Sequence, residues 1–470
     1  MISLDRRRKP ADLLGRIDRL FELSAAKIQS LECSWQPERG APVFTVEGRY
    51  TTRGWTEWTE GFRYGSALLQ FDATGDRSFL ESGRAQTLAR MAPHLTHVGV
   101  HDHGFNNVST YGALWRMARE HKYDATDWEV RYYELALKVS GAIQARRWTR
   151  LPDGGFIHSF NGAHSLFVDT IRTLRALALS YALGHRLIEE QDDQVNLLTR
   201  LLQHARATAK ANIFYGTTSG PYDVRGRTAH ESLFNVANGT YRGPSTQQGF
   251  SPFSTWTRGL AWAMLGFAEQ LEWIATLPVP ALRDAGDDDP SAWMLEAARA
   301  TCDFYIDTAA CADGIPYWDT GAPGLSALGD WGSHPADPFN DREPVDSSAA
   351  AIAAQGLLRL ARVLDARGED GTRYEQAGLR VLDTLFDDRG PYLSADPNHQ
   401  GLILHSVYHW PNGWDHVPAG AKTPRGESSQ WGDYHAREAA LYVRRLAEQG
   451  AYLSFFGPQT HTDRQRPAAK

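Results

Sequence analysis

The chain has 470 residues and a formal net charge of −7, and 42% of its residues are hydrophobic. This composition supports a large core. It contains neither the long basic run of a nucleic-acid-binding protein nor an apolar stretch that could cross a membrane. The N-terminal arginines precede no apolar run, so we expect no signal peptide and a cytoplasmic location, with the periplasm less favoured. Cys33, Cys302 and Cys311 lack metal-binding spacing and indicate a reducing compartment.

Apolar residues recur at helical spacing in about a dozen segments, whereas strand-like alternation is scarce. The approximate ranges of these segments, in chain order, are 10–31, 57–72, 76–97, 104–120, 126–147, 164–183, 190–212, 255–275, 291–309, 346–366, 371–386 and 431–449.

The helical segments alternate in character. Some carry charges on one face, as in Arg373–Leu382, and those between them are apolar almost all round, as in Ser347–Leu358. A helix that is apolar all round is buried on every side. The alternation predicts an all-α (α/α)6 barrel, with about six inner helices wrapped by about six outer ones. A helix bundle or an open solenoid is the alternative, and the irregular spacing disfavours the solenoid. We expect one domain over residues 1–460 and a disordered tail over 461–470.

The segments assigned to the inner ring open with polar motifs that contain glycine, histidine or tryptophan. Parallel inner helices would bring these motifs to one end of the barrel, around a pocket whose helix N-termini favour an anion such as a carboxylate. Helix capping explains the Asp, Ser and Gly residues of the motifs but not the tryptophans or His101. The motifs are Trp58–Phe62, His101–Phe105, His164–Asp169, Trp256–Gly259, Asp346–Ala349 and Trp431–Tyr434.

Asp102 is the first candidate for chemistry, and it lies among four histidines, His94, His97, His101 and His103. A metal centre is one interpretation, but hydrolase metal sites with this pattern usually sit on strands and draw carboxylate ligands from elsewhere. A polar wall of an active site is favoured, and a plain surface turn is the remaining possibility. We therefore expect no metal.

Asp169 is the second candidate, because it is an acid near the start of an otherwise apolar helix. A buried carboxylate is costly unless it is paired or functional. A structural ion pair with Arg172 or Arg175 stays open as the alternative. If Asp102 and Asp169 face each other across the pocket, burial and repulsion would raise one pKa, and that carboxyl could donate a proton near neutral pH.

A long segment over 213–254, rich in Gly, Ser, Thr and Asn, precedes the next inner helix, and loops of this length are often functional. Arg258 stands between Trp256 and Trp262, which predicts either a cationic aromatic clamp or core tryptophans beside a surface arginine. No nucleophile elbow, phosphate loop or dinucleotide fingerprint is present, so we expect no cofactor.

Together these motifs resemble the unsaturated glucuronyl hydrolases, family 88 of the glycoside hydrolases. The resemblance runs from the first inner-helix motif to the C-terminal helix. The matching stretches are Trp58–Phe62, His101–Phe105, Val168–Asp169, Gln248–Trp262, Tyr317–Asp319, Asp346–Ile352 and Trp431–Tyr434.

The resemblance implies a barrel enzyme that hydrates the C4=C5 double bond of a terminal unsaturated uronate on a small oligosaccharide, acting as a monomer or homodimer. By the same resemblance, Asp169 is the acid that protonates C4, and Asp102 orients the substrate and tunes Asp169. The remaining positions that match the family's pocket, directly or by their place beside it, are Trp58, His101, His230, Gln248, Trp256, Arg258 and Trp262.

The chain departs from the family at His103 and in the loop His409–Trp414, where sulfate-accepting members carry two serines and a lysine. Trp410 and Trp414 offer faces for stacking on a neutral sugar instead. Three alternatives remain. One is the related unsaturated rhamnogalacturonyl hydrolases of family 105. Another is a sugar 2-epimerase, which would need a histidine acid–base pair. The third is a non-catalytic sugar-binding protein.

Overall fold

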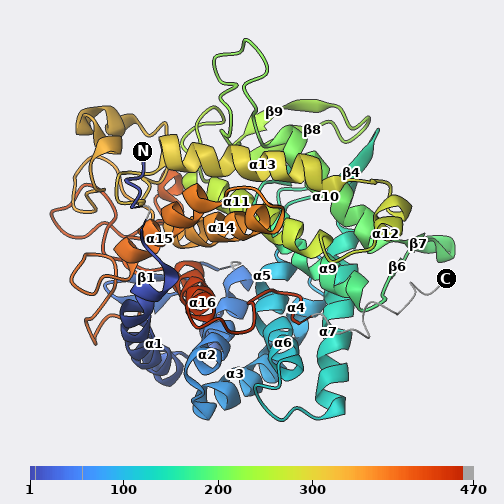
Figure 1. Cartoon of the computed structure of the whole chain (residues 1–470), viewed down its shortest axis with the longest axis horizontal. Coiled ribbons are helices and arrows are strands. Elements are labelled where there is room, and N and C mark those ends of the chain that lie inside the picture. Colours follow the sequence, from blue (N-terminus) through green and yellow to red (C-terminus); the bar gives the residue numbers. More distant parts are fainter. Residues whose placement is uncertain (6, 55–56, 459–470) are drawn as a thin grey trace.

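The computed structural model describes residues 1–5, 7–54 and 57–458, and in this part of the chain the helices form two concentric rings (Figure 1). The helices of the inner ring, in chain order, are α2 (Glu60–Thr74), α5 (His103–Asn107) continued by α6 (Ala113–Arg119), α8 (Thr170–Thr173) continued by α9 (Arg175–Ala182), α11 (Thr257–Ile274), α14 (Ser347–Ala366) and α16 (Gln430–Ala447). The main outer helices are α1 (Leu14–Ser34), α3 (Arg77–Arg90), α7 (Asp127–Arg146), α10 (Leu197–Ala211), α13 (Pro290–Phe304) and α15 (Thr372–Leu385).

The inner ring closes on itself. Each inner helix packs on the next, from α2 through α5, α8, α11 and α14 to α16, and α16 packs back on α2. Outer helices cover the seams, with α13 on α11, α15 on α14 and α7 on both α5 and α9. The predicted (α/α)6 barrel is confirmed. The end of the predicted domain at residue 460 and the predicted tail over 461–470 lie outside the described residues.

Glycines make the close approach of the inner helices possible. At each junction of the inner ring one glycine faces the neighbouring helix, and a Cβ added there would come within about 3 Å of it, a distance that real Cβ atoms rarely show. The pairs are Gly61 with Asn106, Gly104 with Thr173, Gly266 with Ile171, Gly356 with Met264, Gly432 with Ser348 and Gly65 with Tyr434.

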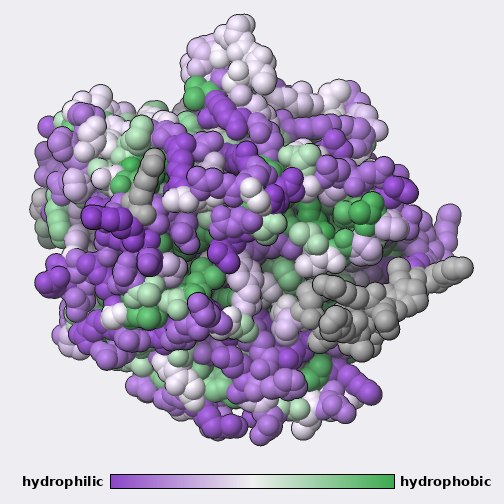
Figure 2. Space-filling model, viewed as in Figure 1, coloured by the Kyte–Doolittle hydropathy of each residue, from purple (hydrophilic) through white to green (hydrophobic). Residues whose placement is uncertain are grey.

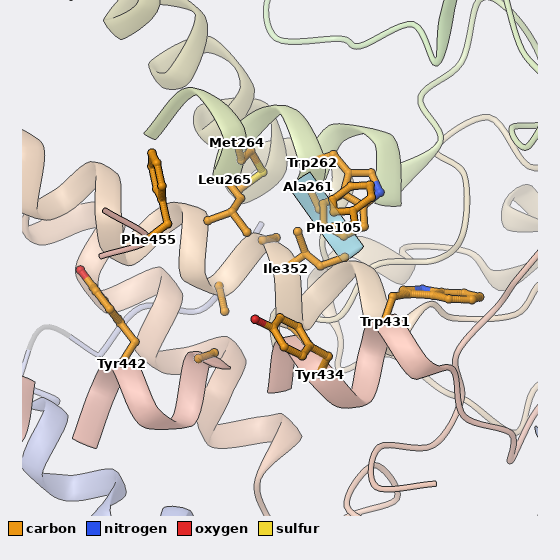
Figure 3. Packing of buried hydrophobic residues seen from close by; sticks show 14 of the residues in the cluster. Phe105, Ala261, Trp262, Met264, Leu265, Ile352, Trp431, Tyr434, Tyr442 and Phe455 are labelled. Atoms are coloured by element: carbon orange, nitrogen blue, oxygen red, sulfur yellow. The ribbon is translucent and has the colours of Figure 1, made fainter. Parts of the chain in front are cut away.

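Between these contacts, large apolar side chains of the inner helices fill the barrel. Figure 3 shows Trp262, Met264 and Leu265 of α11 turned toward Ile352 of α14 and Tyr434 of α16. The side chain of Trp262 is almost completely buried. This packing explains why α11 and α14 read as apolar all round in the sequence, whereas α15 is amphipathic.

The strands are short and lie outside the rings. The antiparallel pairs are β1 (Phe44–Val46) with β2 (Arg49–Thr51), β3 (Trp148–Leu151) with β4 (Gly154–Ile157), and β6 (Leu187–Ile188) with β7 (Gln194–Val195). A three-stranded sheet joins β5 (Ser165–Phe167), β8 (Glu231–Phe234) and β9 (Tyr241–Ser245) in the order β5-β8-β9, with Phe167 opposite Glu231.

This sheet corrects two expectations. The helix predicted over 164–183 begins as a strand and becomes helical only at Thr170, and the segment 213–254 holds two strands rather than an unstructured loop. Pairing between β5 and β8 joins residues about 65 positions apart, which local periodicity does not report.

The visible face of the molecule is mostly hydrophilic, with apolar residues in small separate patches (Figure 2). Among the helices that the structure describes, none is long and apolar enough to cross a membrane. The three cysteines are free thiols, with Cys302 and Cys311 buried.

Candidate active site

A cavity of about 650 Å³, open to solvent, lies at the end of the barrel where the inner helices begin. Nine of the eleven predicted site residues line it, and His230 and Trp410 do not. The lining residues are Trp58, Val100, His101, Asp102, Phe105, Phe160, Phe167, Asp169, Gln247, Gln248, Trp256, Arg258, Trp262, Tyr408, His409 and Trp414.

The two aspartates occupy equivalent places at the starts of neighbouring inner helices. Asp102 directly precedes α5 and Asp169 directly precedes α8, and neither side chain caps its own helix. His101 lies between them, with Nε2 3.2 Å from Asp169 Oδ1 and 3.7 Å from Asp102 Oδ1. The same imidazole nitrogen therefore hydrogen-bonds Asp169 and lies close enough to Asp102 to interact with its charge.

Burial and mutual charge separate the pKa values of this cluster. Burial, followed by the charge of Asp169, raises the pKa of Asp102 above its ordinary value, against the charge of His101. Burial also pushes the pKa of Asp169 upward, but the hydrogen bond and charge of His101 outweigh it and hold that pKa below its ordinary value. Burial alone would lower the pKa of His101, and the two carboxylates raise it instead. The shifts therefore favour protonation of His101 and Asp102 over protonation of Asp169.

The structural ion pair considered for Asp169 is not formed. Arg172 binds Glu269 at 3.1 Å and Glu438 at 2.6 Å, deeper in the barrel, and Arg175 faces the same two glutamates. This cluster satisfies the arginines without Asp169, which leaves the aspartate to His101 and the pocket.

Arg258 forms a cationic aromatic clamp, one of the two arrangements considered from the sequence, but its second tryptophan is Trp431 and not Trp262. Its guanidinium carbon lies 4.6 Å from the ring centroid of Trp256 and 4.8 Å from that of Trp431, rather than against Trp262. Arg258 also pairs with Asp346 at 3.0 Å and donates to Gln248 Oε1 at 2.8 Å. The clamp therefore fixes one wall of the pocket, and its charge is shared with a buried carboxylate.

His230 lies behind the wall and supports it. Its ring packs between Phe167 and Trp256, at centroid distances of 4.5 and 4.7 Å. Nδ1 accepts hydrogen bonds from the backbone N–H groups of Gln247 and Gln248, so the proton of the neutral ring is on Nε2. Burial lowers the pKa of His230 to about 4, which keeps the ring neutral.

The loop that departs from the family pattern contributes only part of what was expected. Trp414 lines the pocket and lies 4.8 Å from His409 and 5.4 Å from Tyr408, centroid to centroid. Trp410 starts a short 3-10 turn and packs against the core instead. Trp58 stacks on Trp431 with centroids 5.1 Å apart, and Trp431 in turn contacts Tyr408 at 4.9 Å.

Sequence reasoning missed a group of aromatic residues that enclose His101. Phe160 stacks on the His101 ring at 6.0 Å, and Phe167 meets it edge-on at 5.6 Å. Phe105 and Phe167 belong to two of the polar motifs, His101–Phe105 and His164–Asp169, so the sequence could have indicated that they line the pocket. Phe160 belongs to no motif, and only the folding of the β-hairpin and sheet brings it to the pocket.

The histidines around Asp102 hold structural hydrogen bonds. His103 Nε2 donates to the carbonyl of His97 at 2.9 Å, and its Nδ1 lies 3.1 Å from Ser140 Oγ. His94 Nδ1 lies 3.1 Å from the side-chain nitrogen of Asn106. Over the described ranges, no group of three or more His, Cys, Asp or Glu side chains is arranged to hold a metal ion. The expectation of a metal-free enzyme stays a prediction.

Known proteins resemble this chain in sequence and in fold. No family model matches the chain. The unsaturated glucuronyl hydrolase of Bacillus sp. (strain GL1) is 26% identical over 420 residues, covering 87% of this chain and 92% of that protein. An unsaturated chondroitin disaccharide hydrolase of Streptococcus pyogenes serotype M1 is 23% identical, with 84% of each chain covered. A solved structure described as UGL with dGlcA-Glc-Rha-Glc superposes with a TM-score of 0.68 at 23% identity, covering 92% of this chain and 97% of that one.

The fold and these relatives define the class of enzyme to which the chain belongs. It is a glycoside hydrolase on an (α/α)6 barrel. Within that class its similarity is to the unsaturated glucuronyl hydrolases, which confirms the resemblance predicted from the motifs.

Proposed function

We propose that this chain releases a terminal 4,5-unsaturated uronate from a small oligosaccharide by adding water across the C4=C5 double bond. The observation that carries the proposal is the pair of buried aspartates joined by His101 in an aromatic-lined pocket. The activity named for the relatives supports the choice of substrate.

The reaction assigned by the resemblance needs one proton donor and one water. Asp169 gives its proton to C4, water adds to C5, and the proton lost by that water restores the acid. The C5 hemiketal then opens to a ketone by breaking the ring C–O bond. C1 is left as a hemiacetal, which breaks down to an aldehyde and the freed sugar. No displacement occurs at C1, so the usual separation rule for two carboxylates does not apply.

Asp169 must gain its proton when the substrate arrives, because its pKa is depressed in the free site. The uronate brings a carboxylate into the pocket, and a neighbouring negative charge raises the pKa of a carboxyl group. His101, whose Nε2 is hydrogen-bonded to Asp169 Oδ1, is placed to give it a proton. Substrate binding thus converts Asp169 from base to acid.

The sugar beneath the uronate would meet aromatic faces. Tyr408, His409 and Trp414 line that part of the pocket, and burial lowers the pKa of His409 to about 4, so its ring is neutral. A sulfate group needs donors or a cation to replace its hydration. We therefore propose a preference for unsulfated substrates.

A panel of lyase-generated oligosaccharides tests the function. After dialysis against a strong chelator, the chain is incubated with each one while the ultraviolet absorbance of the C4=C5 bond is followed. We expect absorbance to fall as one sugar is freed per bond lost. An epimerase or a binding protein would leave the absorbance intact, and a response confined to rhamnose-linked unsaturated galacturonate would favour the family 105 activity. Restoration of lost activity by added metal would contradict the metal-free site.

A matched sulfated and unsulfated pair in the panel tests specificity. We expect a higher kcat/KM for the unsulfated member. A tenfold preference for the sulfated member, about 1.4 kcal/mol of discrimination, would refute the proposed preference without touching the proposed reaction.

A further inference from the structure

The main chain of His101 is held by two side chains that lie outside the pocket. Its carbonyl oxygen accepts a hydrogen bond from Gln144 Nε2 at 2.8 Å and lies 2.9 Å from Thr173 Oγ1, whose one proton is shared between this carbonyl and that of Thr170 at 3.0 Å. Gln144 Nε2 also donates to Thr173 Oγ1, so the three groups form a closed triangle. Both side chains are 0% exposed, and a buried amide or hydroxyl is costly unless it is used.

The triangle joins an inner helix to an outer one. Thr173 ends α8, the short helix that directly follows Asp169. Gln144 belongs to the outer helix α7 and points inward, one turn after Ser140, whose hydroxyl lies 3.1 Å from His103 Nδ1. The outer helix thus holds the segment that carries Asp102 at two points, and α8 carries the opposing carboxylate.

We propose that Gln144 and Thr173 are positioning residues for the acid pair. They hold the main chain of His101 at a fixed place beside α8, so that its imidazole spans Asp102 and Asp169. The kinetic part of this inference rests on the proposed function, and the structural part does not.

Small movements matter at this position. His101 Nε2 is within hydrogen-bond distance of Asp169 but 3.7 Å from Asp102, so a shift of the main chain by a fraction of an ångström would alter both interactions. Misplacement by about 1 Å can cost about 100-fold in rate. The titratable and charged groups that influence His101 are Asp102, Asp169, Arg147, His158, His204 and His230.

Thr173→Val tests the proposal because valine keeps the shape and removes the hydroxyl. We expect kcat to fall about 10- to 100-fold while KM changes less than about threefold. Thr173→Ser should restore turnover. Thr301→Val is the matched control, since Thr301 is also fully buried and its hydroxyl bonds a backbone carbonyl at 2.8 Å, but on the outer helix α13. It should lose stability without losing kcat.

A second readout needs no turnover. The His101 imidazole is titrated by NMR in the substrate-free protein, with its signal assigned by a His101→Gln variant. We expect its pKa to fall by about half a unit or more in Thr173→Val, because the ring moves away from the carboxylates, and to recover in Thr173→Ser. If the wild type proves inactive on every substrate, the proposed function fails while this titration still decides the positioning role.

Gln144→Leu provides an independent variant, with Gln70→Leu as its control. Gln70 is likewise buried and donates to a backbone carbonyl, that of Phe21, at 3.0 Å. We expect Gln144→Leu to lower kcat and the double variant with Thr173→Val to show less than the sum of the two losses, because both act on one carbonyl. A folded Thr173→Val or Gln144→Leu protein with wild-type kcat and an unchanged His101 titration overturns the inference.

Discussion

Asp102 and Asp169 are almost equally buried, at 7% and 8% exposure, yet their pKa values shift in opposite directions. Burial therefore does not distinguish them. The difference comes from His101, whose Nε2 is closer to Asp169 and donates to it. One imidazole placed off-centre between two carboxylates is enough to shift their pKa values in opposite directions.

Replacing Asp169 by asparagine removes the proton donor and keeps the shape. We predict that kcat falls by about 10²–10⁴ and that the melting temperature stays close to that of the wild type. Asp303→Asn, on the outer helix α13, is the control and should keep full activity. The absorbance change on the best substrate measures kcat for both variants, and thermal unfolding gives their melting temperatures. Wild-type kcat in Asp169→Asn would show that the acid has been misassigned.

Residue types marked Asp102, Asp169 and Arg258 as candidates, and the family resemblance supplied most of the other pocket positions, but the contacts of these residues could not be predicted. An acid at the start of an apolar helix marked Asp169, and the crowding of histidines marked Asp102. Nothing in the sequence could show that Arg172 binds Glu269 rather than Asp169, because that choice depends on how α8 and α11 pack. Phe160, and Gln144 on an outer helix, escaped notice for the same reason.

At the scale of elements, helical periodicity located the barrel correctly because each inner helix is buried on all sides. It failed where the chain is extended, since β5 is three residues long and pairs with a distant strand. The positions of the glycines mark where inner helices pack closely, which hydrophobic periodicity does not show. Gly104 and Gly266 sit where α8 meets its two neighbours in the inner ring.

Gly104→Ala should separate α5 from α8. Its Cβ would lie 2.3 Å from the carbonyl oxygen of Thr173, which is backbone and cannot easily move away. We predict a loss of about 1–3 kcal/mol in unfolding free energy. We also predict a fall in kcat, because Asp102 and Asp169 directly precede the two helices and would move with them. Chemical denaturation and turnover assays measure these effects.

Gly15→Ala, near the start of α1, is the control for that substitution. An added Cβ there meets nothing within 4 Å, so the variant should be at least as stable as the wild type. A Gly104→Ala protein as stable and active as Gly15→Ala would contradict the close-approach argument.

At the scale of the whole molecule, buried neutral histidines dominate the response to pH. Burial lowers the pKa values of eight histidines well below 6.5, to about 4 for six of them and about 3 for His204. The eight are His94, His103, His158, His204, His230, His405, His409 and His435. Burial raises the pKa values of four carboxyls, to about 6 for Asp313, Asp319 and Asp415 and to about 7 for Glu272, which acts in the opposite sense but involves fewer groups.

We predict that the unfolding free energy falls as the pH drops from 6.5 toward 5. In this range the unfolded chain protonates its histidines and the folded chain does not, so protons favour unfolding. The four carboxyls offset part of this loss. Denaturant titrations at several pH values give the number of protons taken up on unfolding. A free energy that stays constant or rises over this range would refute the prediction. Monomer or homodimer state and cellular location stay predictions.

Among the described residues, the cluster of Arg172, Glu269 and Glu438 lies beneath Trp262 in the barrel, and the segment Leu453–Phe455 lies beside this cluster at the far end, so the pocket opens where the inner helices begin. Under the proposed reaction the uronate occupies the blind end and the freed sugar lies nearer the solvent. The sugar must therefore depart first and the keto-uronate last. In steady-state terms this is an ordered release of two products, in which the keto-uronate competes with substrate for the free enzyme and the freed sugar inhibits noncompetitively.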